Sequence, residues 1–136
     1  MKIISTYTTK EAVTDGYLVR VADGQSQEAG IKYPVYMTRA VWDKYVEVPE
    51  GMEMEQDKSG RLWDILWMFM WAAKANSSSL MMFKFDCRLP DKGDWEKHEK
   101  MDGSRLTRTI TLKSVIQGQD FGDPSPAIFI MKPGED

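Results

Sequence analysis

The sequence predicts an α+β fold in which an antiparallel sheet of three to five strands packs against a central helix rich in Trp and Met, with shorter N-terminal helices. Three observations predict it. Residues 60–74 are apolar nearly all round at helical spacing. Residues 80–89 alternate between apolar and polar, which is typical of a half-buried strand. The chain of 136 residues, 42% apolar and 29% charged, matches one globular domain, so we expect a single domain over residues 1–136.

The N-terminal part is expected to hold short helices and one or two strands. A helix, a strand, a helical turn and a second strand are expected in that order over residues 9–15, 17–21, 26–29 and 33–37. Thr8 and Glu11 form a capping-box pattern, and Gly16 suits the position just after a helix. Pro34 favours an edge strand or a strand start.

The middle of the chain carries the strongest helical pattern. Thr38 is expected to cap a helix over residues 39–46, and a polar loop over residues 50–59 follows. Within residues 60–74, tryptophans spaced by four residues form one stripe: Trp63, Trp67 and Trp71. Other apolar residues form an adjoining stripe: Leu62, Ile65, Leu66, Phe69 and Ala73.

We expect this helix to be buried on more than one side and the tryptophan stripe to lie mainly in the core. The alternative is a homodimer or partner surface through Trp63, Trp67 and Trp71, because aromatic residues and Met are favoured at interface centres. The apolar run is shorter than the roughly 18–20 residues of a membrane span, so no membrane partner is expected.

The C-terminal part is expected to form a three-stranded antiparallel meander behind this helix. Strands are expected over residues 80–89, 105–117 and 127–131, separated by a charged loop or hairpin end over residues 90–103 and a turn over residues 118–126. In the first strand Met81, Phe83, Phe85 and Cys87 face one way, and we expect the helix to cover that face.

Little in the sequence favours catalysis. Cys87 is the one cysteine and lies on an apolar strand face, while His98, the one histidine, lies in a charged run and is expected to be solvated. Phosphate-loop, zinc-ligand and nucleophile-elbow motifs are absent. We therefore expect no enzyme, cofactor or metal. The N-terminus is too polar for an export signal, which favours a cytoplasmic location.

Two alternatives to a purely structural role stay open for the charged residues. Four carboxylates gather near the end of one predicted strand: Asp86, Asp91, Asp94 and Glu96. A metal-dependent hydrolase would depend on Asp86 or Asp94, although lysines alternate with the acids in this segment. A basic strand face with a nearby aromatic residue could bind nucleic acid: Trp95, Lys97, Lys100, Arg105, Arg108 and Lys113. We favour a solvated sheet face, because acids balance the bases and the net charge is -3.

Three segments carry a resemblance: residues 32–35 (KYPV), 38–42 (TRAVW) and 60–64 (GRLWD). With the strand sequences that follow, the chain resembles an uncharacterised family of small proteins from phages, plasmids and other bacterial mobile elements. Residues 90–103 fit this family least. The resemblance implies a small accessory protein encoded on mobile DNA and brings no functional residues with it.

The function we expect from this context is that of a non-enzymatic accessory protein that binds a protein of its bacterial host, such as an inhibitor of a defence system of the anti-CRISPR kind. The alternative is a nucleic-acid-binding accessory protein. Candidate binding residues come from the resembling segments and from the basic strand face: Arg39, Trp42, Arg61, Asp64, Trp95, Arg105 and Arg108.

Overall fold

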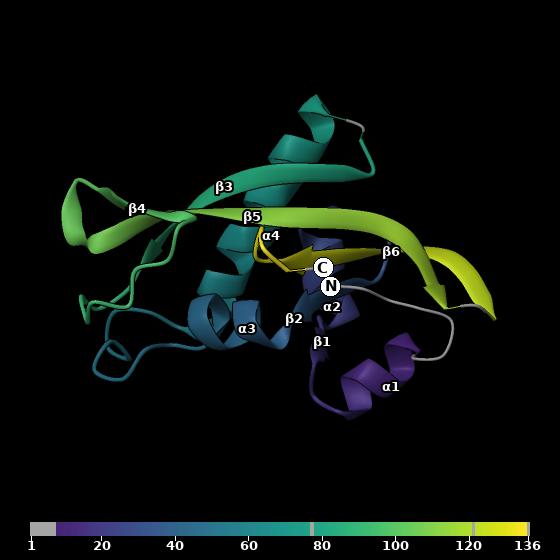
Figure 1. Ribbon diagram of the computed structural model, residues 1–136, viewed down its shortest axis with the longest axis horizontal. Helices are drawn as coiled ribbons and strands as arrows, with labels where there is room; N and C mark the ends of the chain where they lie inside the picture. Colours follow the sequence, from purple (N-terminus) through teal and green to yellow (C-terminus); the bar gives the residue numbers. More distant parts are fainter. Residues whose placement is uncertain (1–7, 77, 121, 136) are drawn as a thin grey trace.

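The computed structural model describes residues 8–76, 78–120 and 122–135 (Figure 1). Its elements follow in this order: α1 (Thr9–Thr14), β1 (Leu18–Arg20), α2 (Asp23–Glu28), β2 (Val35–Thr38), α3 (Arg39–Val41), the π-helical turn η1 (Trp42–Val46), α4 (Lys58–Ala75), β3 (Leu80–Arg88), β4 (Glu99–Asp102), β5 (Ser104–Asp120) and β6 (Asp123–Met131). The α+β prediction is confirmed.

One six-stranded sheet joins the two halves of the chain, with β1-β2-β6-β5-β3 as its order and β4 paired to the remaining part of β5. The antiparallel meander of β3, β5 and β6 is as predicted. The prediction of a purely antiparallel sheet with three to five strands is wrong. β2 runs parallel to β6, with Val35 beside Ile128, so the N-terminal hairpin β1-β2 extends the C-terminal meander.

The long strand β5 organises the sheet. β3 pairs with it from Thr107 to Val115, whereas β4 and β6 pair with different lengths of its opposite edge. β4 lies inside the segment predicted to be a charged loop or hairpin end. Glu99 and Lys100 pair with Ile110 and Thr109, so the C-terminal part of that segment forms a hairpin with β5. β3 is therefore an edge strand of the described sheet.

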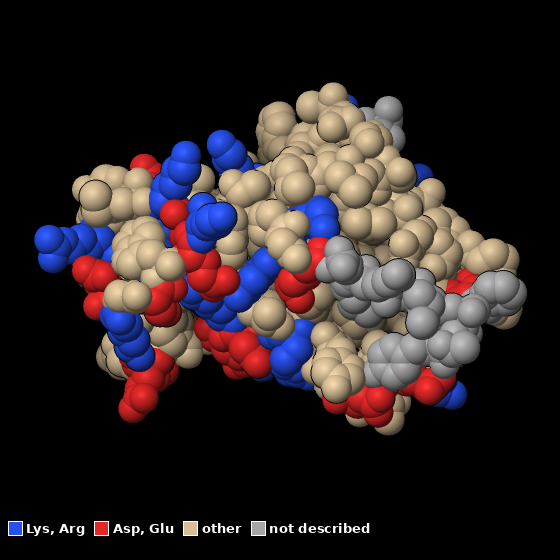
Figure 2. Space-filling model, in the orientation of Figure 1, with Lys and Arg blue, Asp and Glu red and all other residues tan. Residues whose placement is uncertain are grey.

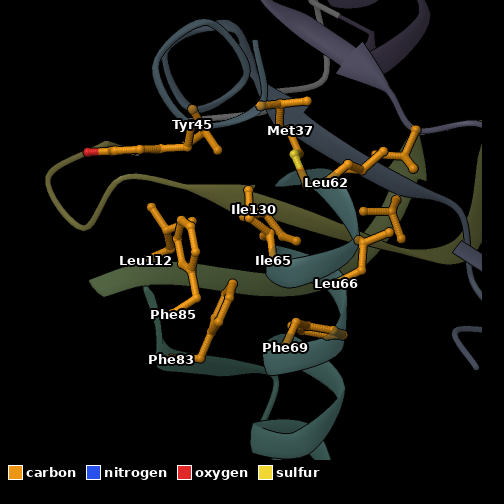
Figure 3. Packing of buried hydrophobic residues seen from close by; sticks show 14 of the residues in the cluster. Met37, Tyr45, Leu62, Ile65, Leu66, Phe69, Phe83, Phe85, Leu112 and Ile130 are labelled. Carbon is orange, nitrogen blue, oxygen red and sulfur yellow. The ribbon is translucent and has the colours of Figure 1, made fainter. Parts of the chain in front are cut away.

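The main core lies between α4 and one face of the sheet, as predicted (Figure 3). From α4, Leu62, Ile65, Leu66 and Phe69 are buried. Phe69 meets Phe83 of β3 edge-on, with ring centroids 5.7 Å apart. Met37, Leu112 and Ile130 complete this layer from three further strands.

A smaller core covers the opposite face, beneath α1. Tyr36 of β2 stacks on Phe129 of β6 with ring centroids 5.3 Å apart, and Ala12 of α1 packs in the same cluster. The predicted capping box is present, since Thr8 and Glu11 each bond the other's backbone N–H.

Some predicted boundaries differ from the structure. The helix expected over residues 39–46 is regular only to Val41 and continues as η1. The turn expected over residues 118–126 is shorter, because β5 extends to Asp120 and β6 begins at Asp123. Ser77, between the predicted helix over residues 60–74 and the strand over residues 80–89, and Phe121, in the predicted turn, lie outside the described residues. Among the described helices, none has the length and hydropathy that a membrane crossing needs.

Candidate functional site

The outer side of α4 carries a row of aromatic rings that we call the tryptophan ladder: Trp63, Trp67 and Trp71. The rings of Trp63 and Trp67 stack with centroids 5.5 Å apart, and Trp71 meets Trp67 edge-on at 6.5 Å. Trp67 is 45% exposed and Trp71 is 60% exposed. Only Trp63, at the start of the ladder, is partly buried against the core. The prediction that this stripe belongs to the core is wrong for Trp67 and Trp71.

Helical geometry explains why the rings are exposed. The buried residues Leu62, Ile65, Leu66 and Phe69 centre on one side of α4. At 100° per residue, Trp67 projects from almost the opposite side. The sheet covers α4 from one direction, so the stripe behind it stays in solvent although the helix is apolar nearly all round.

A groove flanks the ladder on each side of α4. On the α2 side, a groove of about 620 Å³ is lined by Gln25, Glu28, Asp57, Ser59, Gly60, Leu62, Trp63 and Leu66. On the β3 side, a groove of about 370 Å³ is lined by Asp64, Trp67, Met68, Lys84, Phe85, Asp86 and Thr109. The ladder therefore forms an aromatic ridge between two hollows, a shape that suits docking on another surface.

A second cluster of polar residues lies at the β4 end of the sheet, where charged side chains gather on the face shown in Figure 2. Arg108 and Glu99 are its centre, and both side chains are fully buried. Arg108 Nη1 donates to Glu99 Oε1 at 2.8 Å, and Nη2 donates to Asp94 and to the Pro90 carbonyl oxygen at 2.9 Å. The guanidinium also lies over the Trp95 ring, 3.9 Å from its centroid.

Two lysines complete this charged cluster. Lys44 Nζ lies 2.9 Å from Glu99 and 2.7 Å from Glu96, and Lys132 Nζ lies 3.0 Å from Glu96. Burial alone would raise the pKa of the Glu99 carboxyl, but hydrogen bonds from Tyr45, Lys44 and Arg108 outweigh burial and lower it. Each carboxylate therefore stays ionised against a fixed cation.

Tyr45 connects His98 to this cluster. Its hydroxyl donates to Glu99 Oε2, and His98 Nε2 lies 2.7 Å from the same hydroxyl. Since a phenol has one proton, His98 is assigned as the donor through its Nε2–H. Burial lowers the pKa of His98, so the ring is neutral near pH 7. The prediction of a solvated His98 is wrong, because its side chain is only 11% exposed.

Glu96, His98 and Glu99 also present ligand atoms within 4.8 Å of one another, close enough to surround one metal ion. The ammonium groups of Lys44 and Lys132 already occupy the carboxylate oxygens, however, and Tyr45 occupies Nε2 of His98. A cation would have to displace them against their charge. The chemistry of this donor set thus favours a structural ion-pair cluster over a metal centre.

The structure brings three of the seven candidate residues together: Trp95, Arg105 and Arg108. Arg105 is exposed and lies 4.0 Å from Asp91, whose carboxylate also accepts from Trp95 Nε1. Arg108 is buried and saturated by acids, so its guanidinium is not available to a phosphate. Of the two arginines on this strand, one could contact nucleic acid from the surface.

Arg61 and Asp64 are neighbours on α4 but do not form an ion pair within the described residues. Arg61 is buried, and its guanidinium donates to Gln56 Oε1, to the carbonyl oxygens of Lys44 and Arg88, and to Cys87 Sγ. It ties α4 to η1 and β3. Burial raises the pKa of the Cys87 thiol to about 11, despite the nearby guanidinium, so Cys87 is not a nucleophile at neutral pH.

Arg39 lies on α3, and Trp42 begins η1, the turn that also supplies Lys44 and Tyr45 to the charged cluster. Arg39 is exposed, donates from Nε to the Gly16 carbonyl oxygen at 2.9 Å and lies 3.6 Å from Asp43. Trp42 is half-buried and donates from Nε1 to Glu47 at 2.8 Å. These contacts hold local structure together.

Comparison with known proteins adds one result. A family model matches residues 1–136. The chain belongs to DUF6573, a family of unknown function. Searches of curated proteins and of solved structures find no match. Membership in DUF6573 therefore brings no residue roles with it, and any function rests on the two sites described above.

Sequence reasoning missed the buried half of the charged cluster, although a signal was present. Arg108 has the same strand parity as Ile110 and Leu112, which points it toward the core. Glu99 pairs directly with Ile110, so it faces the same way. The exposure of the ladder had no such signal, because only the tertiary fold decides which apolar side of α4 is covered.

Proposed function

We propose that this protein is a non-enzymatic binding protein that docks on a protein of its host cell through the tryptophan ladder. The observation that carries the proposal is the exposure of Trp67 and Trp71 on a ridge that faces away from the core. Met68, 39% exposed, extends the same apolar surface. A contiguous exposed apolar patch of this kind marks an interaction surface more often than a structural element.

The residue types support a protein partner. Trp is enriched among the residues that dominate interface energetics, and Met is enriched at interfaces generally. Stacking holds Trp63, Trp67 and Trp71 in place before binding, so little side-chain entropy is lost on docking. A partner with an apolar groove would cover the ridge.

The charged cluster supports binding over catalysis. Its carboxylates, Tyr45 and His98 are hydrogen-bonded to one another, so their protons and lone pairs serve the fold. Catalytic groups, by contrast, point into a cleft where a substrate can reach them.

A narrower form of the proposal follows from the resemblance to proteins of phages and plasmids. In this form the protein acts in the bacterial cytoplasm, and its partner is a component of a defence system such as CRISPR. Inhibition would then follow from covering a functional surface of that component. Reconstitution of the purified defence complex with this protein tests the narrower form directly.

The general proposal is tested by affinity capture from bacterial lysate, with and without nuclease, using the wild type and Trp67→Ser/Trp71→Ser. A control variant is Tyr33→Ser, because Tyr33 is 46% exposed but lies outside the ladder. We expect one protein to be retained after nuclease treatment by the wild type and the control, and lost by the ladder variant. At a hot-spot cost of about 2 kcal/mol per Trp, affinity falls by about thirtyfold for each of the two tryptophans replaced.

Two results would contradict the proposal. Retention of the same protein by the ladder variant would place the binding surface elsewhere. Recovery that disappears with nuclease would favour the alternative function, nucleic-acid binding by the exposed basic residues near Arg105. That alternative predicts steep salt dependence, and Arg105→Ala would weaken binding.

A further inference from the structure

The outer edge of β3 is a long unpaired strand edge within the described sheet. Leu89 N–H donates to Leu106 O, and the Ser79 carbonyl oxygen accepts from Ile116 N–H. The backbone N–H and C=O groups of odd-numbered residues therefore point toward β5. In an antiparallel ladder the alternate residues then point their N–H and C=O groups outward. These are Leu80, Met82, Lys84, Asp86 and Arg88.

Natural edge strands are commonly short, bulged, charged, interrupted by Pro or covered. Of these protections β3 has charged side chains, and they are of both signs: Lys84, Asp86 and Arg88. β3 has nine residues, contains no Pro and keeps a regular register with β5 throughout. The side chains of these even-numbered residues are exposed. Among them, Leu80 is 53% exposed and Met82 is 50% exposed. Such an edge can accept another strand.

We propose that this edge binds a second copy of the chain, with the two β3 strands antiparallel and the two-fold axis at Phe85. The two sheets would then continue into one. In this register Lys84 lies opposite Asp86 of the second copy, and Asp86 lies opposite its Lys84. Both pairs are hydrogen-bonded positions and carry opposite charges, a favourable cross-strand arrangement.

Charge and strand overlap together select this register over its neighbours. An axis at Cys87 would also place opposite charges together, Asp86 and Arg88, but it would pair only residues 86–88 of β3. In a symmetric antiparallel pair, opposite residues share a sheet face, so the axis must pass through a residue. An axis at Lys84 would place two lysines opposite each other. An axis at Asp86 would place two aspartates opposite each other and Lys84 opposite Arg88. An axis at Phe83 would place Asp86 opposite Leu80 and Lys84 opposite Met82.

The surface beside β3 has room for the second α4. The groove lined by Asp64, Trp67 and Met68 shares Asp64, Phe85 and Asp86 with a smaller hollow of about 170 Å³. Together they form a furrow along the β3 edge at the residue where the axis lies. Figure 1 shows the C-terminal end of α4 extending past β3. In the proposed dimer, the two-fold symmetry places this end of one copy near the furrow of the other copy.

This inference does not depend on the proposed function. Trp67 and Met68 line the furrow on the β3 side of α4, whereas Trp63 lines the groove on the opposite side. Pairing would place both copies of α4 on the same face of the joined sheet and would leave the groove beside Trp63 outside the β3 furrow. Loss of the dimer and loss of host-protein capture can therefore be measured with different variants.

Sedimentation equilibrium of the full chain tests the pairing. We expect the wild type to dimerise, and Lys84→Asp and Asp86→Lys each to weaken the dimer by about tenfold or more, because each single reversal places like charges opposite each other. The double variant Lys84→Asp/Asp86→Lys exchanges the partners and should restore dimerisation. Lys10→Asp, the same charge change on α1, is the control and should have no effect. Circular dichroism verifies that each variant is folded.

A disulfide cross-link tests the register. Opposite hydrogen-bonded residues have Cα atoms about 5.5 Å apart, within the range that a disulfide spans. A mixture of Lys84→Cys and Asp86→Cys chains should cross-link, and neither variant should do so alone. A monomeric wild type, a dimer that withstands both single reversals, or cross-linking of one variant alone would each overturn the proposal.

Discussion

Arg108 and Glu99 form an ion pair that is sealed from solvent between β4 and β5. Such a pair contributes modest net stability, because removing two charges from water costs nearly as much as their attraction returns. Its effect is to fix geometry. Arg108 connects the Pro90–Asp94 segment to the sheet, and Glu99 receives Lys44 from η1 and so connects that turn to β4.

Removing one member of this pair should be costly. Arg108→Met leaves Glu99 buried without the guanidinium that donates to its Oε1, so we expect the free energy of unfolding to fall by about 3–5 kcal/mol. The double variant Glu99→Met/Arg108→Met should lose less than the sum of the two single losses. Urea denaturation measures all three values, and additive losses would show that the two side chains are not coupled.

His98 should make stability depend on pH just below neutrality. Burial holds its pKa below the ordinary value of 6.5, so the unfolded chain binds a proton at a pH where the folded chain does not. The free energy of unfolding is therefore highest above the ordinary His pKa of 6.5. It decreases as pH falls from that value to the pKa of His98 in the folded chain, by at most about 1.4 kcal/mol per pH unit.

Urea titrations on either side of the ordinary His pKa measure this dependence. His98→Gln keeps a donor for Tyr45 and removes the titration, so its stability should be nearly constant in this window. The lowered pKa values of Asp94, Glu96 and Glu99 add a second loss in more acidic solution, and both proteins should show it. An unchanged pH profile in His98→Gln would place the titrating group elsewhere.

At the scale of elements, α4 combines two apolar faces with different roles. Phe69→Ala should reduce the free energy of unfolding by about 3–5 kcal/mol, because it opens a cavity against Phe83. Trp67→Ala should cost less, about 1–3 kcal/mol, the value of its two ring contacts with Trp63 and Trp71. Urea unfolding compares the two, and equal losses would mean that the ladder belongs to the core.

The elements with short-range signals were predictable. The capping box of Thr8 and Glu11, the alternation in β3 and the apolar period of α4 each lie within one segment of sequence. The parallel pairing of β2 with β6 joins Val35 to Ile128, and no local pattern records that separation. β4 was missed because four residues beside a charged loop give too short a pattern.

The candidate site was predictable only in part. The tryptophan spacing identified the ladder, but its exposure follows from the sheet covering α4 on one side. The basic residues of β5 looked alike in sequence, yet Arg105 is 82% exposed and Arg108 is buried. Strand parity separates the two arginines only when the buried face of β5 is known.

At the scale of the whole molecule, the β3 edge makes hydrogen exchange informative. In monomeric Lys84→Asp, the outward amides of Met82, Asp86 and Arg88 should exchange faster than those of Phe83 and Phe85, which face β5. In the wild-type dimer the outward amides should become protected as well. Exchange measured by NMR at residue resolution makes the comparison, and alternation that persists in the dimer would mean that β3 is not at the interface.

The position of β6 between β2 and β5 also affects how the chain folds during synthesis. β6 follows the other strands in chain order, yet it is the link between the hairpin β1-β2 and the strands β3 and β5. An isolated two-stranded hairpin is marginally stable in water. A ribosome that has not yet released residues 123–131 therefore carries two partial sheets with open edges, and the core closes only when this segment emerges. Unpaired strand edges make such a partly folded chain prone to aggregation until β6 has paired.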